Sequence, residues 1–254
     1  MLTSQRKQAI LAALQRDGQV VAKAMSETFG VSEDTVRRDL RELAAEGLLQ
    51  RVHGGALPAS PAMADFAHRQ HIGAEAKSAI AHRAAQMVLP GQVVFIDGGT
   101  TCVQLARSLP QALRGTVVTH SPSIAVELVD HAGIEVVLIG GRLFKHSVVA
   151  VGAAAMEAIG RVRVDLYFMG VTGVHPTAGL STGDFEEASV KRALIERAAE
   201  VVVLASAEKL HAASPYVIAP VQAAQTLVVE GDTAEAVLAP FAALGLAVLR
   251  AGRE

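Results

Sequence analysis

Residues 29–40 read FGVSEDTVRRDL, and this stretch decides the fold of the N-terminal part of the chain. Ser32 is placed as the N-cap of a helix, because its hydroxyl can accept a hydrogen bond from the first helical turn. Val36, Leu40 and Leu43 follow at i, i+4 and i+7, the spacing of one buried helix face. The stretch therefore predicts a short helix that begins after Ser32 and turns most of its polar side chains toward water.

Two further helices precede this one, so the sequence predicts three short helices followed by a strand. The first is expected over residues 4–16 and the second over residues 21–28, with Gly30 in the turn before the third. Two short helices joined by a glycine-containing turn are typical of a helix-turn-helix. The segment 48–55 that follows predicts a β-wing.

The polar face of the third helix has the chemistry to read DNA. Arginine binds guanine edges and phosphates through its planar donor fork, and the start of a recognition helix reaches base edges in the major groove. The candidate DNA contacts are Ser32, Glu33, Thr35, Arg37, Arg38, Arg41, Arg51 and His53. A small helical bundle with solvated charges is the alternative, because Asp34, Asp39 and Glu42 lie on the same helix.

The composition is that of a folded protein without disulfides. Of the 254 residues, 51% are hydrophobic and 19% are charged, which excludes a mainly disordered chain. The single cysteine, Cys102, excludes a disulfide framework and suits a reducing compartment. No run of about 18 apolar residues predicts a membrane span, and the N-terminus does not resemble a signal peptide. We therefore expect a cytoplasmic protein, and the predicted DNA contacts imply that it is nucleoid-associated.

The charge balance alone does not indicate nucleic acid. The formal net charge is −2. Residues 1–60 carry eight Lys/Arg and seven Asp/Glu, and the rest of the chain carries 15 and 18. This difference is too small to predict a polyanionic partner, so the prediction depends on where the charges lie.

The sequence pattern changes after residue 57, which predicts two domains. Prolines and a lack of periodicity mark residues 58–73 as a linker between an N-terminal domain, 1–57, and a C-terminal domain, 74–254. Helical stretches then alternate with β-branched runs at 93–96, 116–119, 134–139, 164–169, 201–205 and 226–229. Continuous apolar strands that alternate with helices predict an α/β domain whose sheet is covered on both faces.

Glycines and hydroxyl side chains follow the first of these strands, where residues 97–101 read DGGTT. Glycines allow a ligand to approach the backbone, and threonine hydroxyls at a helix N-terminus suit a phosphate. A tight turn with Thr100 as N-cap is the alternative. The sequence THS at 119–121 and Gly141 follow neighbouring strands, and ligands gather at such strand ends in an open α/β sheet.

Glu187 and Lys191 form an i, i+4 pair on a predicted helix. One interpretation is a surface ion pair that contributes about 0.3–0.5 kcal/mol. The other is that residues 179–191 close over a ligand, with the turn-rich segment 173–179 allowing them to move.

These residues resemble one family along nearly the whole chain. The stretch 29–40, RVHGGA at 51–56, IDGGTT at 96–101, VTHS at 118–121 and IGG at 139–141 are similar to the DeoR-type (GlpR-like) bacterial transcriptional repressors. The similarity continues through Asp165, Gly179–Ser181, Glu187, Lys191 and Lys209.

The resemblance implies a winged helix-turn-helix that binds operator DNA, and an α/β sensor domain similar in fold to ribose-phosphate isomerases. It implies a repressor of a carbohydrate catabolism operon, controlled by a phosphorylated sugar or related metabolite, and a homo-oligomer, either dimer or tetramer. It places the effector at Asp97, Gly98, Gly99, Thr100, Thr101, Thr119, Ser121, Gly141, Glu187, Lys191 and Lys209. His120 and Ser206 stand where the family usually has Asn and Asp, and both are expected near the effector.

We expect no enzyme activity, catalytic residue, cofactor, metal site or membrane partner. GLSTG at 179–183 matches the G-x-S-x-G pattern of hydrolases, but a turn precedes it where a strand is needed. One alternative is a sugar-phosphate isomerase with a fused DNA-binding domain, in which Glu187 is the base and Lys191 stabilises the enediolate. Another is a metabolite-binding module that does not bind DNA.

Overall fold

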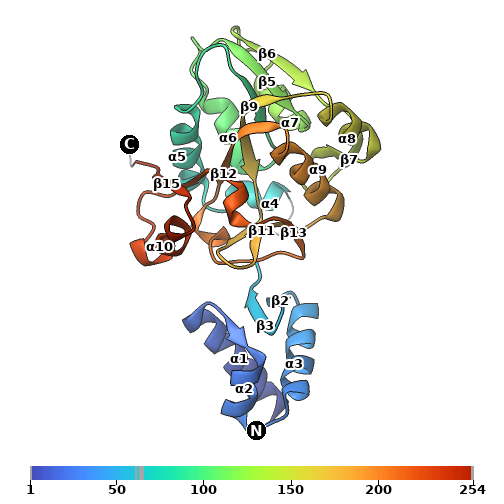
Figure 1. The fold of residues 1–254 in the computed structure, drawn as a ribbon, viewed down its shortest axis with the longest axis vertical. Helices are drawn as coiled ribbons and strands as arrows, with labels where there is room; N and C mark the ends of the chain where they lie inside the picture. The colour runs from blue at the N-terminus through green and yellow to red at the C-terminus, as the bar shows by residue number, and fades with distance from the viewer. Residues whose placement is uncertain (1, 61, 63–65, 253–254) are drawn as a thin grey trace.

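The computed structural model describes residues 2–60, 62 and 66–252. Its N-terminal domain forms a separate lobe (Figure 1). The elements of this lobe are α1 (Thr3–Asp17), β1 (Val20–Val21), α2 (Ala22–Phe29), α3 (Glu33–Ala45), β2 (Leu49–Val52) and β3 (Gly55–Pro58). The three strands pair antiparallel in the order β1-β3-β2. The lobe is a winged helix-turn-helix, as the sequence predicts.

The core of this domain fixes α3 by its apolar face. Val36, Leu40 and Leu43 are buried and pack in one cluster with Ile10 of α1 and Leu49 of β2. The sequence analysis does not predict β1, because a strand of two residues has no detectable pattern of its own. Its pairing with β3 comes from the tertiary fold.

Part of the predicted linker is folded onto the C-terminal domain. The helix α4 (Phe66–His71) lies within residues 58–73. Before it, Ala59 forms a parallel bridge with Ala213, and the Ser60 hydroxyl donates a hydrogen bond to the Thr172 carbonyl. The sequence does not predict this folded segment, because α4 has only six residues and shows no periodicity, and its supporting contacts come from distant segments.

The C-terminal domain is built on a seven-stranded sheet in which every pairing is parallel. The strands are β4 (Val93–Ile96), β5 (Gly115–Thr119), β6 (Ile134–Leu138), β9 (Val164–Gly170), β12 (Ala198–Leu204), β14 (Thr226–Val229) and β15 (Ala247–Arg250). Their order is β15-β14-β12-β9-β4-β5-β6. The order changes direction between β4 and β9, and such a switch point opens a crevice at the carboxyl ends of the strands.

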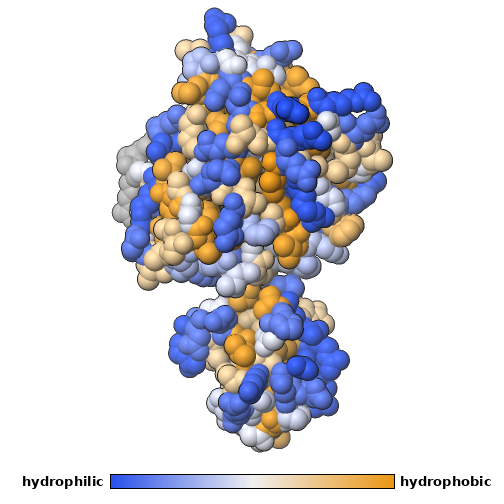
Figure 2. All heavy atoms as spheres, in the orientation of Figure 1, coloured by the Kyte–Doolittle hydropathy of each residue, from blue (hydrophilic) through white to orange (hydrophobic). Residues whose placement is uncertain are grey.

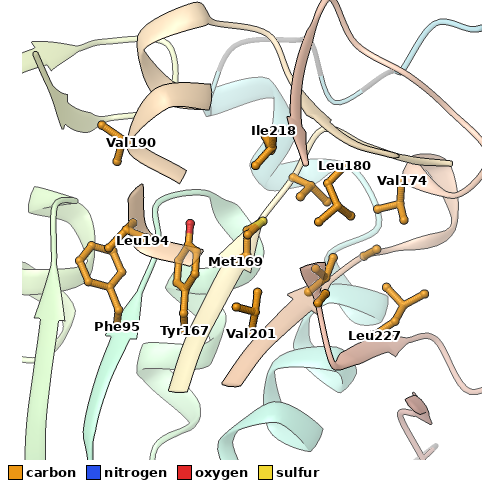
Figure 3. Packing of buried hydrophobic residues seen from close by; sticks show 14 of the residues in the cluster. Phe95, Tyr167, Met169, Val174, Leu180, Val190, Leu194, Val201, Ile218 and Leu227 are labelled. Carbon is orange, nitrogen blue, oxygen red and sulfur yellow. The ribbon is translucent and has the colours of Figure 1, made fainter. Parts of the chain in front are cut away.

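Helices cover both faces of this sheet, as the alternating pattern predicts (Figure 1). One buried cluster includes side chains of α5 (Ala74–Ala85), α6 (Thr100–Ser108) and α7 (Pro122–Glu127). The other includes side chains of α8 (Ala153–Ile159), α9 (Phe185–Ile195) and α10 (Glu235–Ala243). Figure 3 shows Phe95 of β4 and Tyr167 of β9 side by side in this second cluster, with ring centroids 5.6 Å apart in an edge-to-face arrangement.

Two small antiparallel sheets complete the domain. One pairs β7 (Arg142–Phe144) with β8 (Val149–Val151). The other has the order β10-β11-β13 and comprises β10 (Gly173–His175), β11 (Gly179–Thr182) and β13 (Tyr216–Ala219). The turn expected at 173–179 is limited to residues 176–178, because β10 and β11 are buried and pair as a hairpin on either side of it; that this segment moves stays a prediction. No helix among the described residues is long and apolar enough to cross a membrane.

Candidate DNA-binding surface and ligand pocket

The start of α3 is ordered by contacts among the predicted DNA-binding residues. The Ser32 hydroxyl accepts a hydrogen bond from the Thr35 backbone N–H at 3.2 Å, which confirms Ser32 as the N-cap. The Arg37 guanidinium donates to Glu33 at 2.8 Å, an i, i+4 ion pair on the exposed side of the helix. These contacts fix the first turn, the part of a recognition helix that approaches base edges.

Three arginines form an exposed basic surface, which we define as Arg38 and Arg41 of α3 and Arg51 of β2. With Asp34, Thr35 and Arg37 they line a shallow hollow between the helix and the wing. None of the three donates a hydrogen bond or salt bridge to any residue that the structure describes. Figure 2 shows hydrophilic residues along the side of the lobe that carries α3. The hollow therefore presents unpaired guanidinium groups suited to a polyanion.

Two acidic residues of α3, Asp39 and Glu42, are paired away from this surface. Asp39 is fully buried, and Arg6 of α1 binds it through two hydrogen bonds of 2.5 and 3.0 Å. Glu42 and Glu46 pair with Lys7 of α1 at 3.0 and 3.1 Å. These three carboxylates face α1, where Arg6 and Lys7 offset two of their three charges. Asp34 is exposed and lines the basic hollow, so the support for a helical bundle with solvated surface charges is reduced but not removed.

His53 lies apart from the arginine surface. It is exposed near the turn of the wing and lines a groove together with Thr177 and Ala178 of the C-terminal domain. Arg51 lines both the groove and the basic hollow. The structure thus brings together Thr35, Arg37, Arg38, Arg41 and Arg51, whereas His53 is exposed and lines the adjoining groove, which it shares with Arg51.

Asp97 stands at the switch point of the main sheet, just after β4. Its side chain is fully buried and accepts hydrogen bonds from the His120 ring at 2.8 Å and the Tyr167 hydroxyl at 3.0 Å. Backbone N–H groups of Gly98 and Gly170 donate to the same carboxylate at 2.8 and 3.1 Å, and Lys191 forms a salt bridge with it. Burial alone would raise the pKa of Asp97, but Lys191 and His120 hold it well below its usual value.

Glu187 and Lys191 are not a surface ion pair. Asp184 caps α9 and accepts from the Glu187 backbone N–H at 2.9 Å, which directs the first turn of α9 into the domain. The Glu187 carboxylate accepts from the Thr182 hydroxyl at 2.8 Å and lies 3.3 Å from the Lys191 ammonium. Burial alone would lower the pKa of Lys191, but Asp97 and Glu187 together raise it.

A pocket opens above this buried network, and we call it the central pocket. Its cavity volume is about 30 Å³, so the pocket is narrow, and it is partly open to solvent. Gly98, Gly99 and the first residues of α6 form one wall, Glu187 and Thr182 another, and Lys209 a third. Gly99 has φ +114°, a conformation that favours glycine, and a Cβ on Gly98 would lie 2.1 Å from a methyl group of Val149. The sharp turn into α6 therefore depends on both glycines.

Two polar groups in the central pocket have no hydrogen-bond partner among the described residues. Thr101 is 2% exposed, and its hydroxyl oxygen has no hydrogen-bond partner among the described residues. Lys209 is 7% exposed and makes no hydrogen bond or salt bridge with the described part of the chain. Burial lowers the pKa of Lys209 to about 8. A hydroxyl donor, a buried ammonium and the N-terminus of α6 converge on this space, which suits an anion.

Six of the eleven predicted effector residues line the central pocket: Gly98, Gly99, Thr100, Thr101, Glu187 and Lys209. Asp97 and Lys191 lie buried beneath it and hold its walls together. Thr119 donates to the Ile96 carbonyl at 2.7 Å, and Ser121 donates to the Val148 carbonyl at 2.9 Å, so both support neighbouring backbone. Gly141 precedes β7 and is not among the lining residues.

The two departures from the family pattern do not line the pocket either. His120 is fully buried between Asp97 and the Ala150 carbonyl, each 2.8 Å from a ring nitrogen. Ser206 is fully buried and donates to Glu208 at 2.6 Å. His120 therefore contacts Asp97 beneath the pocket, and Ser206 contacts Glu208, which lines it; that both positions lie near the effector stays a prediction.

Several lining residues are missing from the sequence-based prediction. Arg69 and Lys77 line the pocket from α4 and α5, and Ser147, Thr182 and Glu208 line it from other segments. Arg69 and Lys77 are 8% and 3% exposed. The sequence gives no sign of these two residues, because the burial of a cationic side chain in or next to a predicted linker cannot be read from the sequence.

Comparisons with known proteins agree with this geometry. A sequence model described as the DeoR-like helix-turn-helix domain matches residues 6–61, and one described as the DeoR C terminal sensor domain matches residues 72–231. The chain belongs to the DeoR family of transcriptional regulators. The HTH-type transcriptional regulator GlpR of Haloferax volcanii is 39% identical over 215 residues, which cover 83% of each chain.

Other relatives are also named as regulators. The glycerol-3-phosphate regulon repressor of Escherichia coli is 32% identical over 210 residues, which cover 82% of this chain and 83% of the relative. These names agree with the prediction that this DeoR-family protein is a regulator and not an enzyme. A solved ribose 5-phosphate isomerase from Methanocaldococcus jannaschii aligns over 52% of each chain with a TM-score of 0.39 and 20% identity. That similarity is too low to support a conclusion about activity.

Proposed function

We propose that this DeoR-family regulator represses a carbohydrate catabolism operon, and that a phosphorylated sugar or related metabolite in the central pocket controls its DNA binding. The observation that carries the proposal is the pair of unpartnered buried groups, the Thr101 hydroxyl and the Lys209 ammonium, at the N-terminus of α6. A phosphate would satisfy both groups and also the first N–H groups of the helix. Glycerol 3-phosphate is the first ligand to test, because one relative is named for the glycerol-3-phosphate regulon.

The operator is bound by α3 and the wing. Arg38 and Arg41 reach the major groove and its phosphates from α3, and Arg51 reaches the backbone from β2. Ser32, Glu33, Thr35 and Arg37 complete the contact surface at the start of the helix. Support comes from the exposed, unpaired arginines and from the neutralisation of nearby acidic residues by α1. His53, exposed near the turn of the wing and two residues from Arg51, is the remaining contact of this surface.

The regulator acts as a homo-oligomer in the cytoplasm, associated with the nucleoid. Reading two operator half-sites needs at least a dimer. Support comes from exposed apolar side chains on the edge strand β6 of the main sheet, on α7 and in the turn after α7: Val126, Val129, Val137 and Leu138. Burial of these residues between two copies would remove them from water. The domain boundaries 1–57, 58–73 and 74–254 are part of the same proposal.

The test is fluorescence anisotropy of labelled DNA from upstream of the gene for this protein, titrated across salt with and without sugar phosphates. Sequence-preferring binding that falls with salt, and that one phosphorylated metabolite changes, is the expected result. Binding no tighter than to random DNA, or no response to any phosphorylated compound, would contradict the proposal.

A further inference from the structure

The wall of the central pocket includes residues from the segment that leads to the DNA-binding domain. Ala62, Arg69 and Ile72 line the pocket together with Thr101 and Lys209. Arg69 is part of α4, which lies inside the predicted linker. A ligand in this pocket would therefore touch the connection between the domains as well as the sensor itself.

Arg69 is held in place from both of its ends. Its Nη2 donates to the His146 carbonyl at 2.9 Å, and its own carbonyl accepts from the Lys77 ammonium at 2.7 Å. Both side chains are almost completely buried. The guanidinium is thus fixed at the pocket wall and does not extend into solvent.

The charges on this side of the pocket are predominantly positive. Arg69, Lys77 and Lys209 line it with Glu208, and Glu187 across the pocket is already engaged by Lys191. Burial lowers the pKa of both Lys77 and Lys209, which shows that water does not solvate these ammonium groups well. Lys77 and Lys209 form no salt bridge with the described residues, so an anionic ligand would compensate these two charges.

The same segment is attached to the pocket wall closer to the DNA-binding domain. At the end of β3, the Pro58 carbonyl accepts from the Ala213 backbone N–H at 3.4 Å. Ser60 then binds the carbonyl of Thr172, and Thr172 itself lines the pocket. The wing is therefore joined to the pocket by a few residues that all have partners in the C-terminal domain.

We propose that Arg69 binds the anionic group of the effector, so that an occupied pocket fixes α4 and residues 58–62 against the C-terminal domain and thereby sets the position of the DNA-binding domain. The inference rests on the proposed function, in which a phosphorylated metabolite occupies the central pocket. Coupling between ligand binding and DNA binding requires that the ligand favours one state of the protein. Here the ligand binds more tightly to the state in which the linker is docked on the C-terminal domain.

The test uses the full chain and compares Arg69→Gln, Arg69→Lys and Lys209→Ala with the unmodified protein. Arg161→Gln is the matched control, since Arg161 is exposed and pairs only with Glu157 among the described residues. Glycerol 3-phosphate, glucose 6-phosphate and ribose 5-phosphate are titrated by calorimetry, and amide hydrogen exchange of residues 58–72 is followed with the compound that binds. Thermal unfolding checks that each variant is folded.

We expect Arg69→Gln to weaken binding at least tenfold and to abolish ligand-induced protection of residues 58–72, while Arg69→Lys retains part of both effects. If Arg69→Gln is unfolded, the unmodified protein still tests the inference, because the ligand must slow amide exchange in residues 58–72. Binding that depends on Lys209 but not on Arg69, with unchanged exchange in the linker, would overturn the inference and leave the proposed function intact. Failure of every compound to bind the unmodified protein would overturn both.

Discussion

Lys191 of α9 and Asp97 at the end of β4 form a salt bridge in which the two side chains are 1% and 0% exposed. The pair joins the helix that carries Glu187 to the strand that leads into the glycine turn of α6. It closes the floor of the central pocket without reaching its surface. Its role is therefore to hold the walls in register, which separates it from the groups that we expect to touch a ligand.

Loss of Lys191 should destabilise the domain strongly. Lys191→Met leaves the Asp97 charge buried with hydrogen-bond donors but without its cation, and such broken pairs cost about 3–5 kcal/mol. The free energy of unfolding in urea measures the effect. Arg161→Met is the control and should change stability by about 0.5 kcal/mol or less. A loss below about 1 kcal/mol for Lys191→Met would show that the pair is not the structural floor described here.

The same pair predicts how stability depends on acid. The pKa of Asp97 is lower in the folded protein than the value of about 3.9 expected for an unfolded chain. Its contribution is therefore complete above that unfolded value and is lost as the pH falls through it toward the folded pKa. Urea unfolding between pH 6 and 3 should show a smaller loss for Asp97→Asn than for the unmodified protein. Parallel curves would mean that Asp97 contributes nothing to the acid dependence.

Ligand affinity should decrease in alkaline solution because of Lys209. The protonated ammonium binds the anion, and its pKa in the free protein is about 8. Raising the pH above this value removes the proton and weakens binding by up to about tenfold per pH unit. Calorimetric titrations with glycerol 3-phosphate from pH 7 to 9.5 test this, and Lys209→Arg should remove the dependence, since arginine stays charged. An affinity that is constant over this range would exclude Lys209 as the anion-binding cation.

Substitutions on α3 should separate base contacts from phosphate contacts. Arg38→Ala should weaken operator binding by about 1–3 kcal/mol if Arg38 reads a base. Arg41→Ala should reduce the slope of log K against log salt concentration by about one if Arg41 binds a phosphate. Arg37→Ala should have a smaller effect, because Arg37 already pairs with Glu33. Anisotropy at several salt concentrations distinguishes the three variants. Unchanged affinity for both Arg38→Ala and Arg41→Ala would mean that α3 is not the recognition helix.

The sequence predicts the main elements best where apolar runs are continuous. The strands β4 and β14 have the predicted bounds, since Val93–Ile96 and Thr226–Val229 are unbroken runs of buried β-formers. The hairpin β10–β11 is not predicted, because glycine and proline in that stretch indicate a turn while pairing with β13 is a tertiary effect. The helix α4 is missed for the same reason.

The site is predicted only in part. Gly98 to Thr101 carry a local signal for a phosphate, and the structure places them at the pocket. No local sequence pattern tells whether a charged side chain is exposed or buried. Asp39 looks like a surface carboxylate in the sequence but is buried against Arg6, and Arg69 looks like a linker residue but lines the pocket. Arg6 and Asp39 are 33 residues apart in the sequence, and tertiary packing brings them together. Packing also brings Arg69 from the linker to the pocket.

The most direct test of ligand-controlled DNA binding is the reciprocity of the two binding events. The affinity of the full chain for glycerol 3-phosphate, or for the sugar phosphate that binds best, is measured with and without saturating operator DNA. Because coupling between two sites is mutual, the operator must change the ligand Kd by the same factor by which the ligand changes the operator Kd. We predict a factor of about 10 or more in both measurements. Equal ligand Kd values with and without the operator would contradict the account.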